Sequence, residues 1–311
     1  MSRPDAFVLI GLSTADPASA LDAAAAALKA HGARVGEPRS VASRRFHAVT
    51  REVSASGSSA WRDLTRALRP LQVRLGVDLA VVPADPARRA PKVLVMDMDS
   101  TLVQSEGIDE LAKEAGVGEQ VAAITRRAMN GELDFRGALK ERVGLLRGLS
   151  AEALATVHAR TYPTHGAEIL LDTLRKVGCA LAVVSGGFDY FTERLKNRLG
   201  LDHALANRLE VEGGLLTGRL VGDIVDGTRK AAMVDELARA YGVGLDRVVA
   251  IGDGANDLPM LGRAGLGVAF CAKPAVRESA PVTVSVKDLS AVLCFLGYDE
   301  REFAHEAESR C

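Results

Sequence analysis

The feature that most constrains the fold is a set of three short apolar segments, each followed at once by polar residues, with glycines among them after two of the three. The three segments are Lys92–Met96, Ala180–Val184 and Arg247–Ile251. Stretches with helical periodicity separate them, and this alternation predicts a parallel sheet with right-handed crossovers. Ligands of such sheets bind beyond the carboxyl ends of the strands. We therefore expect the three polar clusters to meet at one edge of an α/β sheet.

Residues 1–83 precede this pattern and differ from it. Their periodicity predicts the order β-α-β-β-α-β, which is that of a ferredoxin-like α+β sandwich. Residues 84–91 are rich in Pro, Arg and Ala and are expected to form a solvated linker. We predict a second domain over residues 92–298 and a charged tail over 299–311. In the first domain the expected strands are Ala6–Leu12, Val35–Ser43, Phe46–Val53 and Asp78–Val82, and the expected helices are Pro17–His31 and Trp61–Leu75.

The second domain departs from strand-helix alternation in two places. Residues 106–160 have helical patterns throughout, so we expect an all-helical cap that lies over the strand ends. Leu205–Leu220 alternates around Gly213, which predicts an antiparallel hairpin. Leu266–Phe270 and Val282–Val284 are weaker strand patterns. The expected fold is a Rossmann-like parallel sheet with a helical cap, preceded by the ferredoxin-like domain.

Composition excludes several classes of function. The 311 residues carry a net charge of −1, without the basic stripe or domain that nucleic-acid binding requires. No apolar run approaches the roughly 18 residues of a membrane span, and the first residues lack the apolar core of a signal peptide. The four cysteines are not at metal-ligand spacing and are too few for a disulfide framework. Reduced thiols in a cytoplasmic protein are therefore expected.

Each polar cluster contains groups suited to binding an anion or a cation. Asp97 and Asp99 lie two residues apart, and their repulsion must be offset by a cation or by backbone donors. Ser185 begins a Ser-Gly-Gly run that we expect to open a helix and present N–H groups to an anion. Gly252–Asp257 adds two more carboxylates, and oxygen ligands with phosphate are what Mg²⁺ prefers. Any one cluster occurs in ordinary turns and helix caps, but the three in order favour a functional site.

Together with Lys230, these clusters resemble the four motifs of the haloacid dehalogenase-like phosphotransferase superfamily. Within it, residues 93–296 are similar to the phosphoserine phosphatase family. The likeness is carried by Asp97-Met98-Asp99-Ser100-Thr101 with Glu106, by Met129-Asn130-Gly131 with Phe135 and Arg142, by Ser185-Gly186-Gly187-Phe188, and by Gly252-Asp253-Gly254-Ala255-Asn256-Asp257-Leu258-Pro259-Met260. The resemblance implies hydrolysis of O-phospho-L-serine through an aspartyl-phosphate, the last step of serine biosynthesis.

The resemblance assigns the chemistry to the core motifs. It implies that Asp97 is the nucleophile and that Asp99 protonates the leaving oxygen and then deprotonates the attacking water. Mg²⁺ would be bound by Asp97, by Asp253 and by a backbone oxygen at Asp99. Asp257 would orient the metal ligands or Lys230. The phosphate oxygens would be held by Ser185, the Gly186 N–H and Lys230, with Asn256 at the phosphate or the leaving group.

Selectivity for phosphoserine would depend on the cap. The ammonium group of the substrate needs an anion and its carboxylate needs a cation, and the resemblance implies Glu106 and Arg142 for these roles. Phe135 and Met129 would form apolar walls. Simpler alternatives remain open at this point: Glu106 as a residue of a helix's first turn, Arg142 on a solvated face, and Lys230 as a solvated lysine at a helix start.

The first domain resembles in topology the ACT-type modules found ahead of the catalytic domain in some bacterial members. The Asp-x-Pro-Gly turn often found in such modules is absent, since the chain reads Ser13-Thr14-Ala15-Asp16-Pro17-Ala18 here. Exposed edges of such a sheet predict a homodimer. Two alternatives to the whole interpretation stay open. One is a related phosphotransferase or a phosphatase for another small phosphomonoester such as phosphohomoserine; the other is a non-catalytic serine-sensing protein.

Overall fold

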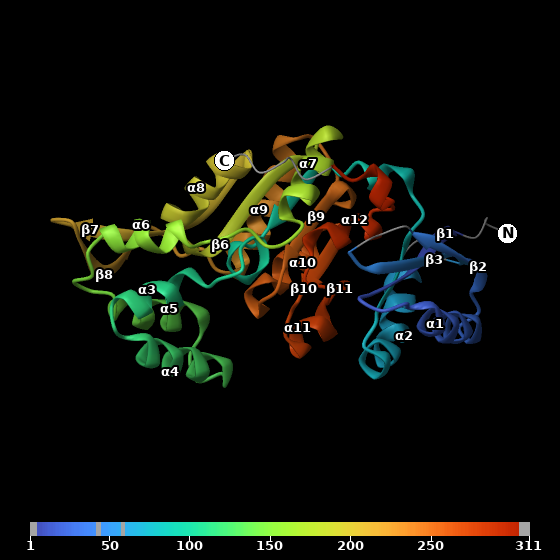
Figure 1. The fold of residues 1–311 in the computed structure, drawn as a ribbon, viewed down its shortest axis with the longest axis horizontal. Helices are drawn as coiled ribbons and strands as arrows, with labels where there is room; N and C mark the ends of the chain where they lie inside the picture. Colours follow the sequence, from blue (N-terminus) through green and yellow to red (C-terminus); the bar gives the residue numbers. More distant parts are fainter. Residues whose placement is uncertain (1–4, 42–44, 57–59, 305–311) are drawn as a thin grey trace.

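The computed structural model describes residues 5–41, 45–56 and 60–304. An N-terminal module lies at one end of an elongated molecule, the α/β core occupies the middle, and the cap helices lie at the other end (Figure 1). Among the described residues, no helix has the length and apolar character needed to cross a bilayer. The expected tail is described only as far as residue 304, and residues 305–311 lie outside the described ranges.

The N-terminal module is a four-stranded antiparallel sheet in the order β2-β3-β1-β4, with two helices. This strand order confirms the ferredoxin-like topology. Helix α1 ends where Gly32 takes a positive φ of 80°, which terminates the Ala-rich run. The expected strand Val35–Ser43 ends at Val41, and its last two residues lie outside the described ranges. The elements are β1 (Asp5–Ser13), α1 (Ala18–Ala30), β2 (Arg34–Val41), β3 (His47–Ala55), α2 (Ala60–Leu75) and β4 (Asp78–Pro83).

The core is a seven-stranded sheet in the order β11-β10-β9-β5-β6-β7-β8. All neighbouring pairs are parallel except β7 and β8, which confirms the doubly wound α/β fold. The strands are β5 (Val93–Met96), β6 (Ala180–Phe188), β7 (His203–Glu212), β8 (Leu215–Val221), β9 (Val248–Gly252), β10 (Leu266–Phe270) and β11 (Val282–Val284). The helices are α7 (Ala167–Lys176), α8 (Asp189–Leu199), α9 (Gly227–Ala240), α10 (Leu258–Arg263), α11 (Pro274–Ser279) and α12 (Val292–Phe295).

Three details differ from the sequence expectations. The Ser-Gly-Gly run does not open a helix, because β6 continues through it to Phe188 with a register shift against β7. The predicted hairpin exists, but its first strand begins earlier and also pairs in parallel with β6, so the hairpin extends the main sheet. The linker is not simply solvated: it forms the 3₁₀ turn Pro86–Arg89, and the half-buried Arg88 donates to the carbonyls of Pro83 and Phe295.

The cap consists of four helices, as the absence of a strand pattern predicted. It is pinned at its base by an antiparallel bridge between Val103 and Pro163, which brings the entering and leaving chain together. A second bridge, between Ser150 and Leu215, ties the cap to the β7–β8 hairpin. The cap helices are α3 (Gly107–Glu114), α4 (Gly118–Met129), α5 (Phe135–Gly144) and α6 (Glu152–Ala159).

Gly166 provides a test of the packing between α7 and the C-terminal segment. Its φ is +74°, and a Cβ there would overlap the Asp288 carboxylate and lie 2.6 Å from the Ser290 nitrogen. We expect Gly166→Ala to lower the free energy of unfolding by about 3–4 kcal/mol, the sum of left-handed strain and overpacking. Gly32→Ala is the control, because its φ is +80° and a Cβ would meet nothing within 4 Å. Urea unfolding should show a loss of only about 1–2 kcal/mol for that control; equal losses would contradict the overlap.

Candidate active site

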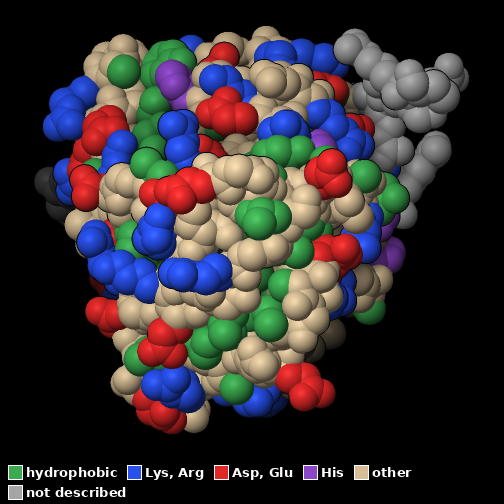
Figure 2. Space-filling view, turned by 90° about the vertical axis from the view of Figure 1, so that its left-hand side faces the viewer, with side chains coloured by type: hydrophobic (Ala, Val, Ile, Leu, Met, Phe, Trp, Pro, Cys, Tyr) green, Lys and Arg blue, Asp and Glu red, His purple; other side chains and the backbone are tan. Residues whose placement is uncertain are grey.

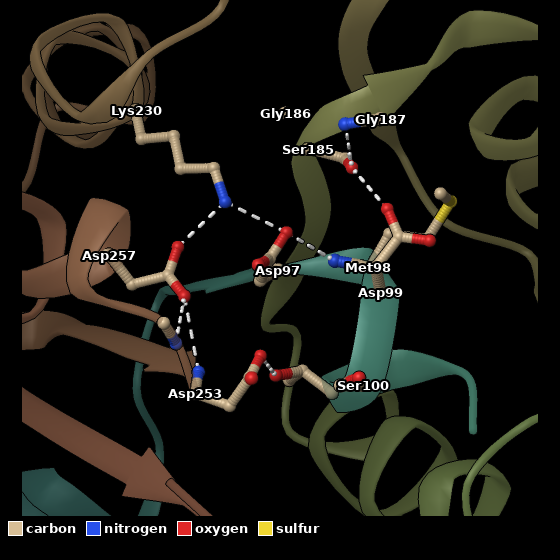
Figure 3. A network of polar contacts seen from close by, with 12 residues as sticks. Asp97, Met98, Asp99, Ser100, Ser185, Gly186, Gly187, Lys230, Asp253 and Asp257 are labelled. Carbon is tan, nitrogen blue, oxygen red and sulfur yellow. Dashed lines mark hydrogen bonds and ion pairs between the residues drawn. The ribbon is translucent and has the colours of Figure 1, made fainter. Parts of the chain in front are cut away.

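The three polar clusters meet because their strands are neighbours. β5 lies between β9 and β6 in the sheet, so Asp97, Gly252 and Ser185 come from adjacent strand ends. After Asp97 the chain forms a π-helical turn over Met98–Leu102, in which Ser100 takes a φ of +56°. This turn directs the side chain of Asp99 toward Ser185 and away from the carboxylates on the other side of Asp97 (Figure 3).

Lys230 lies fully buried between two carboxylates. Its Nζ is 2.8 Å from Asp97 Oδ1 and 2.6 Å from Asp257 Oδ1 (Figure 3). It comes from the first turn of α9, which Asp226 caps by accepting from the Arg229 N–H. Burial alone would lower the pKa of Lys230, but the two carboxylates outweigh it and hold that pKa above its ordinary value. The alternative of a solvated lysine is therefore wrong.

Negative charge exceeds positive charge in this cluster. Burial raises the pKa of Asp97, and Asp257 raises it further against the opposing effect of Lys230. Burial, with Asp257 next, raises the pKa of Asp253 to about 7. Buried carboxylates with too few cations provide the setting in which a hard metal ion binds. Carboxylate oxygens of Asp97, Asp253 and Asp257 lie within 4.8 Å of one another, so the donor set fits such an ion.

The oxygens of Asp257 are already engaged. One accepts from Lys230, and the other accepts from the Asp253 N–H at 3.1 Å and the Gly254 N–H at 3.0 Å. Thr101 donates from its hydroxyl to Asp253 at 3.0 Å. Asp257 thus holds the loop that carries Asp253. The carboxylates that can still offer an oxygen to an ion are those of Asp97 and Asp253. Thr101 belongs to the Asp97–Thr101 motif, but its hydrogen bond with Asp253 was not predicted from the sequence.

Asp99 is held on the other side of the turn. It accepts from the Gly107 N–H at 2.8 Å and from the Ser185 hydroxyl at 3.1 Å. Burial, followed by the nearby Glu106, raises the pKa of Asp99 to about 7. The carboxyl can therefore carry or release a proton near neutral pH. A Cβ on Gly187 would overlap the Asp99 carboxylate, so a larger residue there would displace that side chain.

A cleft of about 740 Å³ opens between these strand ends and the cap. The predicted residues that line it are Asp97, Asp99, Glu106, Met129, Phe135, Arg142, Gly186, Asp253 and Asn256. Ser185, Lys230 and Asp257 do not line it and are fully buried. Lys273 also lines the cleft from the core, and no motif had indicated it, because a lone lysine after a weak strand pattern carries no signal.

The predicted cap residues all line the cleft. Glu106 is the N-cap of α3 and accepts from the Ser100 hydroxyl at 2.7 Å. Arg142 is half-buried rather than on a solvated face; burial lowers its pKa against the opposing effect of Asp109, Glu106 and Asp99. Phe135 packs over Gly186, where a Cβ would come within 2.7 Å of the ring. Met129 is 63% exposed at the cleft mouth.

The end of the molecule that carries the cap has no surface of a single charge. Lys and Arg side chains alternate there with Asp and Glu, with apolar patches between them (Figure 2).

Comparisons with known proteins agree with this geometry. A family model described as haloacid dehalogenase-like hydrolase matches residues 94–262. A phosphoserine phosphatase from Archaeoglobus fulgidus is 50% identical over 227 residues, which is 73% of this chain but 66% of the relative, just under two thirds of its length. A phosphoserine phosphatase from Methanocaldococcus jannaschii is 44% identical over 205 residues, covering 66% of this chain and 97% of the relative.

Two solved structures extend the comparison. A haloacid dehalogenase family hydrolase from Salmonella enterica has a TM-score of 0.79 at 31% identity, covering 94% of this chain and 99% of its own. A structure described as the phospho-aspartyl intermediate analogue of phosphoserine phosphatase has a TM-score of 0.63 at 44% identity, covering 66% of this chain and 99% of its own. The first match covers enough of the chain to include the N-terminal module. The second covers a share of the chain equal to that of the core with its cap.

Lys230 provides a test of the buried charge cluster. Lys230→Met would leave Asp97 and Asp257 without their cation, and removal of one member of a buried ion pair costs about 3–5 kcal/mol of stability. We expect a loss of that size in urea unfolding at pH 7, shrinking as the pH falls, because protonation removes the uncompensated charge. Lys113→Met is the control, since its side chain is 65% exposed beside Glu110. It should lose at most about 1 kcal/mol. An equal loss for both variants would contradict the interpretation.

Proposed function

The chain belongs to the phosphoserine phosphatase family of the haloacid dehalogenase-like hydrolases, and we propose that it hydrolyses O-phospho-L-serine to L-serine and inorganic phosphate. One observation carries the proposal: a single cleft is lined at its floor by Asp97, Asp99 and Asp253 and on its cap side by Glu106 and Arg142. The first group suits phosphoryl transfer, and the second suits the charged ends of an amino acid.

The proposed mechanism has two displacements at phosphorus. An oxygen of Asp97 bonds to phosphorus as the bond to the serine oxygen breaks, and the Asp99 carboxyl gives its proton to that leaving oxygen. Asp99 then takes a proton from water, whose oxygen bonds to phosphorus as the bond to Asp97 breaks. A pKa of about 7 suits Asp99 to both steps, since it is partly protonated at neutral pH. The relative whose structure is described as a phospho-aspartyl intermediate analogue supports this route.

We propose that Mg²⁺ is the cofactor. The carboxylates of Asp97 and Asp253, with a backbone oxygen at Asp99, would hold it, while Asp257 orients Asp253 and Lys230. When bound, the ion supplies positive charge that offsets the phosphate oxygens and the surplus of buried carboxylates.

The phosphate oxygens need donors from the protein as well. We assign this role to the Ser185 hydroxyl, the Gly186 N–H, Lys230 and Asn256. Ser185 and Lys230 lie beneath the cleft floor, where the hydroxyl donates to Asp99 and the ammonium contacts Asp97. Their binding role therefore requires the phosphate to reach the floor of the cleft beside Asp97. An ammonium beside the nucleophile would also offset the repulsion between the Asp97 carboxylate and the phosphate.

The cap would select the substrate. We assign the ammonium of phosphoserine to Glu106 and its carboxylate to the fork of Arg142, with Met129 and Phe135 as the apolar walls. Arg142 is already desolvated among carboxylates, so a substrate carboxylate would meet a guanidinium that has lost part of its water.

The remaining proposals concern the N-terminal module, the oligomeric state and the cellular location. We propose that the N-terminal module is ACT-like, on the strength of its strand order. A homodimer formed through this module is supported by β2, an edge strand whose residues are mostly exposed. The described cysteines Cys179, Cys271 and Cys294 are free, which supports a reducing, cytoplasmic location.

Asp97→Asn tests the nucleophile. We expect turnover to fall by at least about 10⁴-fold, because the amide cannot form the acyl phosphate. Trapping by beryllofluoride, followed by ¹⁹F NMR, should disappear as well. Asp235→Asn is the control, because its ion pair with Arg263 lies at the surface, and it should keep both properties. An Asp97→Asn enzyme with full activity would end the proposed mechanism.

A substrate panel tests the selectivity. We expect kcat/KM for L-phosphoserine to exceed that for phosphothreonine, phosphohomoserine and sugar phosphates. Arg142→Lys should raise KM for phosphoserine roughly tenfold or more, because a lysine loses the two-point contact with the carboxylate, and should leave p-nitrophenyl phosphate hydrolysis unchanged. Arg147→Lys, a nearby cap arginine outside the cleft lining, is the control. Preference for another phosphomonoester, or transfer to an added alcohol faster than to water, would favour the alternative functions.

A further inference from the structure

One short segment of the core touches both the cleft and the N-terminal module. Lys273, Ala275 and Val276 line the cleft at the start of α11. Lys273 Nζ also lies 3.7 Å from Met129 Sδ, so this segment meets the cap across the cleft mouth. Helix α11 has only six residues and is about 9 Å long. The length of this one short helix therefore separates the far end of the segment from the cleft wall.

The far end of the segment is held by the module. The Asp78 side chain, at the start of β4, is 2% exposed and accepts from the Ser285 N–H at 2.5 Å and the Ser285 hydroxyl at 2.9 Å. It also accepts from the Thr283 hydroxyl at 3.3 Å, and Arg277 of α11 lies 3.8 Å away. From α2, Arg69 donates to the Ala280 carbonyl at 2.6 Å. In Figure 1, β11 lies on the side of the core that faces the module, where it packs against β4.

The segment has little structure of its own to fix its place. A six-residue helix is not stable alone, and β11 is a three-residue strand at the edge of the sheet. Its position is therefore set by contacts with other parts of the protein. β11 pairs with β10, Val276 and Ala280 pack in the core, and the module holds the far end. We propose that the N-terminal module sets the position of the Lys273–Val276 wall of the cleft through Asp78, which acts as a positioning residue for substrate binding.

A carboxylate suits this position because it accepts three hydrogen bonds from two residues of the segment. Burial raises the pKa of Asp78, and its hydrogen bonds with Ser285 oppose that rise, so the charged form depends on the segment staying in place. Ser285 is exposed, and water can replace the carboxylate there. Loss of Asp78 should consequently loosen the segment without unfolding the protein.

The test compares Asp78→Ala with the full-length wild type in two measurements. We expect hydrogen exchange to quicken in peptides that cover residues 271–284 and to stay unchanged in β5. We expect KM for phosphoserine to rise roughly three- to tenfold with kcat within twofold, because the wall lines the cleft and the reacting groups lie on other strands. Asp78→Asn, which keeps one acceptor oxygen, should restore part of both effects.

Thr65→Val is the matched control. The Thr65 side chain is 2% exposed in the same module, and its hydroxyl contacts only the Val81 backbone within the module. It should destabilise the protein without changing KM or the exchange of residues 271–284. Unchanged exchange in Asp78→Ala, a fall in kcat in place of a rise in KM, or an equal effect in Thr65→Val would overturn the proposal. The KM readout rests on the proposed function; if the wild type does not cleave phosphoserine, that function fails and the exchange measurement alone decides this inference.

Discussion

The structure of the site depends on one buried interaction, the ammonium of Lys230 between Asp97 and Asp257. Neither carboxylate could be buried there alone, since an unpaired buried charge is strongly unfavourable. The pair also connects three parts of the chain: the end of β5, the first turn of α9 and the loop after β9. Because Asp257 in turn accepts from the Asp253 N–H, the lysine indirectly fixes a carboxylate that it does not touch. The surplus of negative charge that remains is what makes the site receptive to a cation.

The residues that we assign to the chemistry and those that we assign to selectivity lie in different parts of the fold. Asp97, Asp99 and Asp253 lie at the ends of buried, adjacent strands, where a rigid sheet sets their spacing. Glu106, the N-cap of α3, and Arg142 of α5 belong to the cap, which is joined to the core at the Val103–Pro163 bridge and at the β7–β8 hairpin. The sheet therefore sets the spacing of the carboxylates, whereas the helices packed over it set the shape of the cap side of the cleft.

The sequence predicted the fold and the meeting of the motifs because both follow from strand order and local pattern. The sequence-based predictions were wrong or incomplete where tertiary contacts determine the conformation or burial of a residue. The glycines after Ser185 lie in an irregular part of β6, between the residues Val184 and Phe188 that pair with β7, and the low strand preference of glycine gave no sign of this. The burial of Lys230 could not be predicted, because the local sequence around a lysine in a first helical turn does not show whether carboxylates from elsewhere in the chain surround it. Arg88 and Lys273 gave no signal, because their partners are backbone carbonyls and a cap side chain far away in the chain.

The N-terminal module is more than an appendage in this arrangement. Its apolar residues belong to the same continuous cluster as those of the core, and Asp78 holds the edge of the core sheet. An edge strand of three residues has few hydrogen bonds to resist displacement, so the partner that covers it has a large influence on its position. In this chain that partner is the module, and the covered segment continues into the cleft wall. A change in the packing of the module would therefore shift α11, and with it the residues that line the cleft.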